Sequence, residues 1–171
     1  MEQDEHKNCS FIRDKNAFFY RVGAVIIEND CVLMVGNEVV SWLYTIGGRV
    51  HLGETAENAV LREVSEETGV KYEIDKLAFI HENFCTPQGG FIEGLRCHEI
   101  CLYYLMKPRG SQELNSDSYG ADGKEFMKWV PISEFANYEA YPAFFAKKPK
   151  NLPDKIEHIV TIDNEWKEAK I

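Results

Sequence analysis

The stretch 55–68 constrains the fold most strongly, because it has the pattern of an amphipathic helix. Thr55 is predicted to cap its N-terminus and Gly69 to end it, since a hydroxyl accepts a free backbone N–H and glycine readily adopts the left-handed conformation. The apolar face consists of Ala56, Val60 and Val64. Such a helix must bury that face, so we expect it to pack on a sheet and to hold its polar face toward a cleft.

Three glutamates crowd the polar face at positions i, i+3 and i+4, with Cβ atoms about 5–6 Å apart: Glu63, Glu66 and Glu67. Like charges at this spacing destabilise a helix, and the helix dipole disfavours the two nearest its C-terminus. Arg62 is the only base on the helix. A solvated acidic face is one interpretation, but the missing counter-charges favour a bound divalent cation. Carboxylate ligands indicate Mg²⁺, with Mn²⁺ as a substitute, and phosphate chemistry follows as a hypothesis.

A spaced pattern begins at a Gly-Gly pair and runs to the end of this helix: Gly, five residues, Glu, seven residues, Arg-Glu, an aliphatic, any residue, Glu-Glu, any residue, Gly and an aliphatic. The residues are Gly48, Glu54, Arg62, Glu63, Val64, Glu66, Glu67, Gly69 and Val70. This pattern resembles the Nudix box, and the residues at all of its specified positions match. A chance match has odds on the order of one in a million. With the flanking hairpin and Trp129-Val130-Pro131, the resemblance extends from Arg21 to Phe135.

The resemblance to the Nudix hydrolases implies an α/β fold, an α/β/α sandwich with a mixed β-sheet. It implies an enzyme in which metal-activated water attacks phosphorus and cleaves the diphosphate linkage of a nucleoside diphosphate derivative, such as ADP-ribose or a nucleoside triphosphate. The partner is then a small nucleotide, and a homodimer is a further expectation. We expect a single domain at residues 17–171 after a loosely held N-terminal arm at residues 1–16, which shows no periodic pattern.

The same resemblance assigns roles to the box. The implied metal ligands are Gly47, through its carbonyl, Glu54, Glu63, Glu66 and Glu67. Of these, Glu66 and Glu67 resemble the principal ligands, and Glu63 resembles a further ligand or the general base. Arg62 is implied to hold Glu54 by an ion pair, which makes Glu54 a helper near the metal. The catalytic candidates of the box are Glu63, Glu67 and Arg62.

Residues outside the box are assigned more loosely. The family often requires a further catalytic carboxylate, for which Glu125 is our first choice, with Glu99 and Glu93 as rivals. Arg49 and Arg21 are candidates to bind phosphates because both fall at the edge of the predicted cleft, although surface arginines are an equal alternative.

The group X is expected to be selected outside the box, in the stretches 85–95 and 108–123. The second is long enough that a functional lid and simple disorder both stay open. Trp42 and Tyr44 could stack on a base, but core packing is the expected fate of each. His98 is a further candidate substrate contact, with a packed or solvated role as the commoner alternative.

The remaining pattern predicts strands with few helices. They are a hairpin at 18–27 and 31–35, a short strand at 42–45, strands at 77–84 and 97–106, a last strand at 125–130 and a helix start at 131–135. These elements do not alternate as βαβ units, so a mixed sheet is favoured.

Charge and cysteine content exclude several classes. The net charge of -9 offers no basic face for a nucleic-acid backbone or an anionic membrane, and no apolar run reaches the length of a membrane span. The acidic N-terminus is not that of a secretory signal. Five cysteines without a C-x-x-C pair predict reduced thiols and a cytoplasmic location.

Two other functions fit the same scaffold. A non-catalytic nucleotide-sensing module would be favoured by loss of a box acid, and none is lost. An isomerase of isoprenoid diphosphates would need a reactive cysteine and an acid in its pocket, which the sequence does not place. Removal of an RNA cap is disfavoured by the acidic balance.

Overall fold

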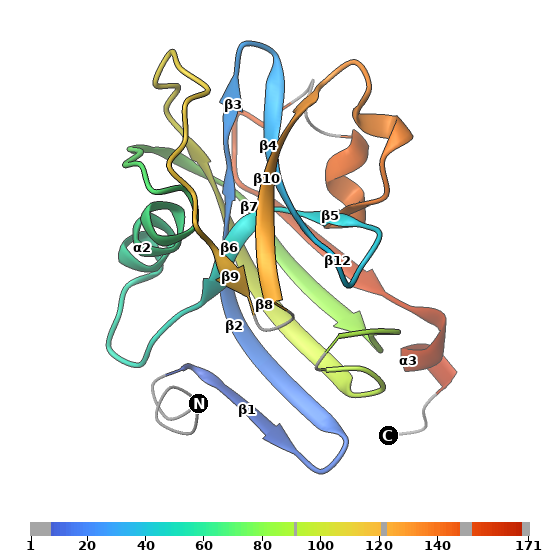
Figure 1. Ribbon diagram of the computed structural model, residues 1–171. Helices are drawn as coiled ribbons and strands as arrows, with labels where there is room; N and C mark the ends of the chain where they lie inside the picture. Colours follow the sequence, from blue (N-terminus) through green and yellow to red (C-terminus); the bar gives the residue numbers. More distant parts are fainter. Residues whose placement is uncertain (1–7, 91, 121–122, 148–151, 169–171) are drawn as a thin grey trace.

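Two mixed β-sheets carry most of the chain in this computed structural model, which describes residues 8–90, 92–120, 123–147 and 152–168 (Figure 1). The first sheet has the order β1 (Ser10–Arg13), β2 (Asn16–Val25), β8 (Arg96–Met106), β7 (Ile74–Cys85) and β12 (Glu157–Ile162), and β6 (Ile46–Arg49) also pairs with β2. The second has the order β11 (Ala140–Tyr141), β5 (Leu43–Tyr44), β4 (Cys31–Asn37), β10 (Gly123–Pro131) and β9 (Tyr119–Gly120), with β3 (Ile27–Glu28) beside β4. Each sheet contains both parallel and antiparallel pairs, as predicted.

Helix α2 (Ala56–Thr68) forms where the sequence predicts it, and both of its ends are capped. The Thr55 hydroxyl accepts the backbone N–H of Asn58 at 3.2 Å. Gly69 adopts a left-handed φ of 68° and donates its N–H to the Ser65 carbonyl at 3.0 Å. These caps satisfy backbone groups that a helix end otherwise leaves unpaired. No helix in the described part of the chain has the length and apolar character that crossing a membrane requires.

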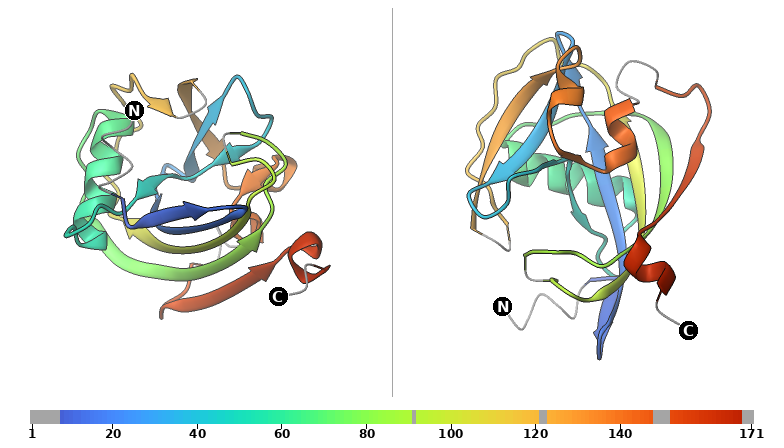
Figure 2. Two further views of the ribbon diagram at one scale, coloured as in Figure 1. Left: turned by 90° about the horizontal axis from the view of Figure 1, so that it is seen from below. Right: turned by 90° about the vertical axis from the view of Figure 1, so that its right-hand side faces the viewer.

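Strand β4 lies between two hydrophobic cores because successive side chains of a strand point to opposite faces. Leu33 and Val35 pack in the core that α2 covers, whereas Val32 and Met34 pack in the core covered by the short 3₁₀ helices η1 (Phe135–Asn137) and η2 (Ala143–Lys147). Figure 2 shows α2 and these 3₁₀ helices on opposite sides of the strands. The layering is that of the predicted α/β sandwich, with two sheets in place of one.

Several elements differ from the sequence-based expectation. Ser10–Arg13 form strand β1, paired antiparallel with β2, so the prediction of a loosely held arm is wrong for these residues. The strand at 123–131 is not the last, since β11 and β12 follow it. The helix predicted from 131 is reduced to the 3₁₀ turn η1. The missed strands β1 and β12 lie at the two ends of the first sheet, where pairing on one side stabilises a strand that exposes apolar residues. The boundary between an arm at 1–16 and a domain at 17–171 stays a prediction.

Candidate active site

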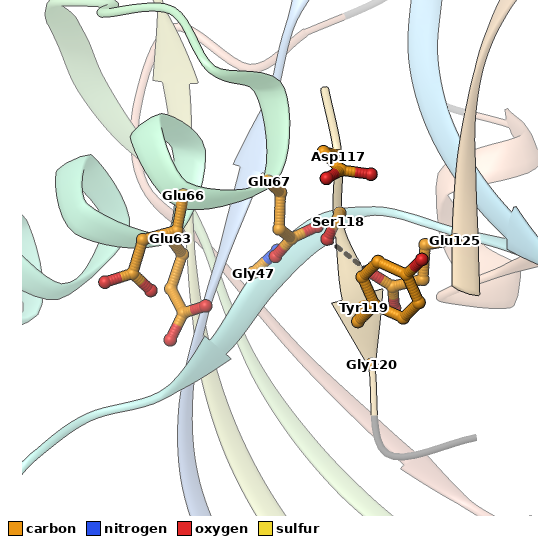
Figure 3. A pocket seen from close by; sticks show the side chains of 9 residues that line it. All are labelled: Gly47, Glu63, Glu66, Glu67, Asp117, Ser118, Tyr119, Gly120 and Glu125. Carbon is orange, nitrogen blue, oxygen red and sulfur yellow. Dashed lines mark hydrogen bonds between the residues drawn. The ribbon is translucent and has the colours of Figure 1, made fainter. Parts of the chain in front are cut away.

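A pocket of about 320 Å³ opens between α2, the glycine turn at the start of β6 and the segment that leads into β10 (Figure 3). Its lining residues are Gly47, Glu63, Glu66, Glu67, Asp117, Ser118, Tyr119, Gly120 and Glu125. Five of them are carboxylates, and none is a lysine or arginine. The pocket therefore suits a cationic ligand, or an anionic one that arrives with cations.

Glu67 is the most deeply buried acid of the pocket, with 8% of its surface exposed. Burial raises the pKa of Glu67 well above its usual range, and the nearby negative charges of Glu125 and Glu63 add to the rise. A hydrogen bond from the Gly47 N–H to Glu67 Oε1, 3.0 Å long, partly opposes it. The Gly47 N–H thus orients the Glu67 carboxylate. A cation bound in the pocket would favour its charged form, which burial and the neighbouring acids disfavour.

Arg62 organises the acids on the helix side of the pocket. Its Nε and Nη2 donate to the two oxygens of Glu54 at 2.9 and 3.0 Å, and its Nη1 donates to Glu63 at 2.7 Å and to Glu66 at 3.3 Å. The hydrogen bonds from Arg62 hold the pKa of Glu54 below its usual value. Burial raises the pKa of Glu63, although Arg62 opposes the shift. The expected ion pair between Arg62 and Glu54 is confirmed, and Glu54 itself does not line the pocket.

Close approaches require glycine at Gly48, where the box begins, and at Gly47 just before it. Gly47 has a φ of 149°, and a Cβ there would collide with the carbonyl of Val22 on the neighbouring strand. A Cβ on Gly48 would overlap the carboxylate of Glu63. The glycine turn thus lets the backbone pass against both the sheet and the acid face of the helix.

Glu125, the first choice for the further carboxylate, lines the opposite wall of the pocket from strand β10. Its two rivals do not line the pocket: Glu99 pairs with Arg21 at 3.4 Å, and Glu93 is exposed in the loop after β7. The geometry therefore favours Glu125 among the three, and its catalytic role stays a prediction.

The predicted phosphate-binding arginines lie outside the pocket lining. Arg21 and Arg49 face each other across the β2–β6 pair. Arg21 contacts Glu99, and the guanidinium of Arg49 lies 4.8 Å from the centre of the Phe19 ring. Each arginine has a partner on its own sheet and neither lines the pocket. Binding of phosphate by these residues stays a prediction.

The second wall comes from the stretch 108–123, where the sequence analysis expects the group X to be selected but names no lining residue. Over its described residues, this stretch is bonded to the rest of the fold at several points, and a role as a lid stays a prediction. At its start, the backbone N–H groups of Arg109 and Gly110 donate to the buried carboxylate of Glu28. Further along, the Asn115 N–H donates to the Thr68 carbonyl at 2.9 Å. The Ser116 hydroxyl then donates to the Glu67 carbonyl. These anchors hold a wall with four lining residues: Asp117, Ser118, Tyr119 and Gly120. The only sign in the sequence was the length of the stretch and its position before Glu125.

The donor set fits a hard divalent cation in kind. In the part of the chain that the structure describes, no three acidic, histidine or cysteine side chains already form a group that could hold a metal ion. The pocket nonetheless offers only oxygen donors, as Mg²⁺ and Mn²⁺ prefer. Burial and the nearby acids Glu125 and Glu63 raise the pKa of Glu67, and a bound cation would offset this effect. The Glu66 side chain is 61% exposed beside the pocket, with its contact to Arg62 at 3.3 Å. These are the residues we expect to hold a cation.

The model of the NUDIX domain family matches residues 18–152, and the chain belongs to this family of hydrolases, whose members generally use divalent metal ions. Among solved structures, it resembles a mutator MutT protein from Bacillus halodurans, at 16% identity and a TM-score of 0.64, covering 86% of this chain and 92% of that one. It also resembles an ADP-ribose pyrophosphatase from Streptococcus suis, at 14% identity and a TM-score of 0.55, covering 84% and 98%. At these identities the likeness shows the fold.

Two curated relatives are closer in sequence. The putative mutator protein MutT4 of Mycobacterium tuberculosis is 36% identical over 95 residues, which cover 55% of this chain and 34% of that protein. A MutT-like protein of Streptomyces ambofaciens is 32% identical over 114 residues, which cover 66% of this chain and 64% of that protein. The match thus spans about a third of the first relative and just under two thirds of the second.

Proposed function

We propose that this chain is a pyrophosphohydrolase that uses Mg²⁺, with Mn²⁺ as a substitute, to cleave the diphosphate linkage of a nucleoside diphosphate derivative. The observation that carries the proposal is the pocket in which three acids of α2 lie across from Glu125 around the Gly47 backbone. ADP-ribose and nucleoside triphosphates are the first substrates to test, since an ADP-ribose pyrophosphatase and MutT proteins share the fold.

The pocket residues divide into three tasks in this proposal. Glu66 and Glu67 hold the cation, helped by the Gly47 carbonyl and, at a distance, by Glu54. When bound, the cation neutralises phosphate oxygens and lowers the pKa of a water molecule. A pocket carboxylate, Glu63 or Glu67, then accepts a proton from the attacking water. Glu125 is the further catalytic carboxylate, on the opposite wall of the pocket.

Arg62 serves the reaction indirectly, by fixing the carboxylates of Glu54 and Glu63. Arg21 and Arg49 are proposed to bind the outer phosphate of the substrate. Arg21 would have to leave Glu99 to do so, and this exchange is reasonable because a phosphate offers a guanidinium two oxygens.

The decisive experiment is a panel of nucleoside diphosphate derivatives assayed with Mg²⁺, comparing the native chain with Glu67→Gln. We expect the variant to cleave the best substrate at least about 100-fold more slowly, because it lacks the charge of a metal ligand or base. Glu57→Gln is the matched control, since Glu57 is an exposed acid of the same helix away from the pocket. Equal turnover by the native chain and Glu67→Gln would remove Glu67 from the mechanism. Tight nucleotide binding without turnover would instead identify a sensing module.

The isoprenoid isomerase finds no support, because none of the five cysteines lines the pocket. Location and assembly belong to the same proposal. A cytoplasmic location is supported by the five cysteines, all of which are free thiols. Homodimer formation rests on family resemblance alone, and sedimentation of the purified chain tests it.

A further inference from the structure

Both oxygens of the Glu125 carboxylate are bound by hydroxyl groups that come from other elements. Tyr44 of β5 donates to Oε1 at 2.8 Å, and Ser118 donates to Oε2 at 2.7 Å. Figure 3 shows the bond from Ser118 beside the pocket. Tyr44 lies 81 residues from Glu125 in the chain, so tertiary folding brings its hydroxyl to the carboxylate, whereas Ser118 lies only 7 residues away.

The direction of the Tyr44 proton follows from a third residue. The side-chain amide of Asn37 donates to the Tyr44 oxygen at 3.3 Å, while the other end of the same amide accepts two backbone N–H groups of the turn after β4. A phenol has a single proton, and with its oxygen already accepting from Asn37 that proton points to Glu125. Burial and the bond to Glu125 both raise the pKa of Tyr44, which keeps the phenol protonated as a donor.

The Ser118 side is equally constrained. Ser118 is only 7% exposed, and its carbonyl accepts the backbone N–H of Glu125 at 3.0 Å while its hydroxyl binds the carboxylate. Main chain and side chain thus join the same two residues. A Cβ on Gly120 would collide with Glu125 Oε1, so the residue at 120 leaves the space that the carboxylate occupies.

The partners of Glu125 differ in kind from those on the helix side. Glu54 and Glu63 are held by the charged Arg62, which offsets their negative charge. Hydroxyl groups orient a carboxylate and leave its net charge available to a cation or a water molecule. A glutamate without such bonds would lose conformational entropy when it is ordered for the reaction. The two hydroxyl bonds order the Glu125 side chain already in the folded protein, before substrate binds.

We propose that Tyr44 and Ser118 are positioning residues, which hold the charged Glu125 carboxylate in one orientation toward the pocket for the hydrolysis. The inference rests on the proposed function, because it assigns Glu125 a part in that reaction. It explains why a half-buried tyrosine stands at the end of β5, where core packing alone would accept phenylalanine.

The test is a double-mutant cycle on kcat for the best nucleoside diphosphate substrate with Mg²⁺. Glu125→Gln should lower kcat about 100-fold, and Tyr44→Phe and Ser118→Ala should each lower it about 10-fold with little change in KM. In the Glu125→Gln background, Tyr44→Phe should have no further effect, because the hydroxyl acts only through that carboxylate. Tyr138→Phe, which removes a phenol hydroxyl outside the pocket, is the control with native kcat. Native kcat in Tyr44→Phe, or an equal loss in both backgrounds, would overturn the proposal.

A second readout does not depend on turnover. With tyrosine labelled at Cζ with ¹³C, the resonance that disappears in Tyr44→Phe should shift in Glu125→Gln and stay in place in Tyr138→Phe. An unmoved resonance would overturn the arrangement even in an active enzyme. Failure of the proposed function has a different signature: no substrate is cleaved, or Glu67→Gln turns over like the native chain.

Discussion

The two walls of the pocket hold their carboxylates by different means. On the helix wall, Glu63 and Glu67 are placed by helical periodicity, and Arg62 binds the acids around it. On the opposite wall, Glu125 is placed by two hydroxyl groups, one from Tyr44 far away in the chain and one from Ser118 seven residues before it. The spacing of acids on a helix can be recognised in a sequence, whereas the hydrogen-bond partners that position Glu125 are seen only in the fold.

The largest effect is expected from removing the hub of the helix wall. Arg62→Ala leaves Glu54 and Glu63 without their cationic partner and should lower turnover about 100-fold or more. It should also reduce the free energy of unfolding by about 2–3 kcal/mol, since the guanidinium is largely buried. Arg62→Lys keeps the charge but lacks the planar guanidinium. Its turnover and its free energy of unfolding in urea should lie between those of the native chain and of Arg62→Ala. A native level of turnover in Arg62→Ala would show that the helix wall does not depend on its hub.

Glycine variants compare the two walls directly. Gly48→Ala pushes a methyl group into the Glu63 carboxylate and should lower kcat about 100-fold, because small displacements of reacting groups are costly. Gly120→Ala overlaps one oxygen of Glu125 rather than the whole carboxylate, and should cost only about 10-fold. Gly89→Ala, where the added carbon makes an ordinary contact with Trp42, is the control. Equal effects at Gly48 and Gly120 would mean that the two walls are equally rigid.

Because its pKa is raised, the ionised Glu67 carboxylate should lower the free energy of unfolding at neutral pH. A carboxyl whose folded-state pKa exceeds its unfolded value contributes stability at low pH, and that contribution is lost as the pH rises through the folded-state pKa. Glu67→Gln keeps an oxygen for the Gly47 N–H but cannot ionise. At neutral pH with EDTA it should therefore be about 1–2 kcal/mol more stable than the native chain, and the gap should close near pH 4. Urea unfolding across this pH range measures the difference, and added Mg²⁺ should stabilise the native chain more than the variant. A variant less stable at neutral pH would contradict this reading of Glu67.

The smallest effect is expected where the walls meet. Ser116→Ala removes the hydroxyl that joins the second wall to the Glu67 carbonyl, and should cost about 1 kcal/mol of stability with less than about a threefold change in kcat. Ser111→Ala, which removes only an exposed hydrogen bond to the Glu113 N–H within the same stretch, is the control. A large loss of kcat in Ser116→Ala would show that the helix wall relies on its neighbour for more than stability.

Much of the helix side was predictable from the sequence. The caps at Thr55 and Gly69, the acid face and the ion pair of Arg62 with Glu54 are all local or nearly so, and the structure confirms them. The anchored stretch that forms the second wall was not predictable, because its bonds to Glu28 join residues 81 and 82 positions apart. Nor were the partners of Arg21 and Arg49, which depend on strand pairing.

The sequence by itself determined the family, the capped helix and the spacing of its acids, since a helix repeats every 3.6 residues whatever surrounds it. The tertiary structure decided which carboxylate outside the box faces these acids and which hydroxyls hold it there. Hydrogen bonds between distant segments form only once the sheets have paired, and no periodicity in the chain records them.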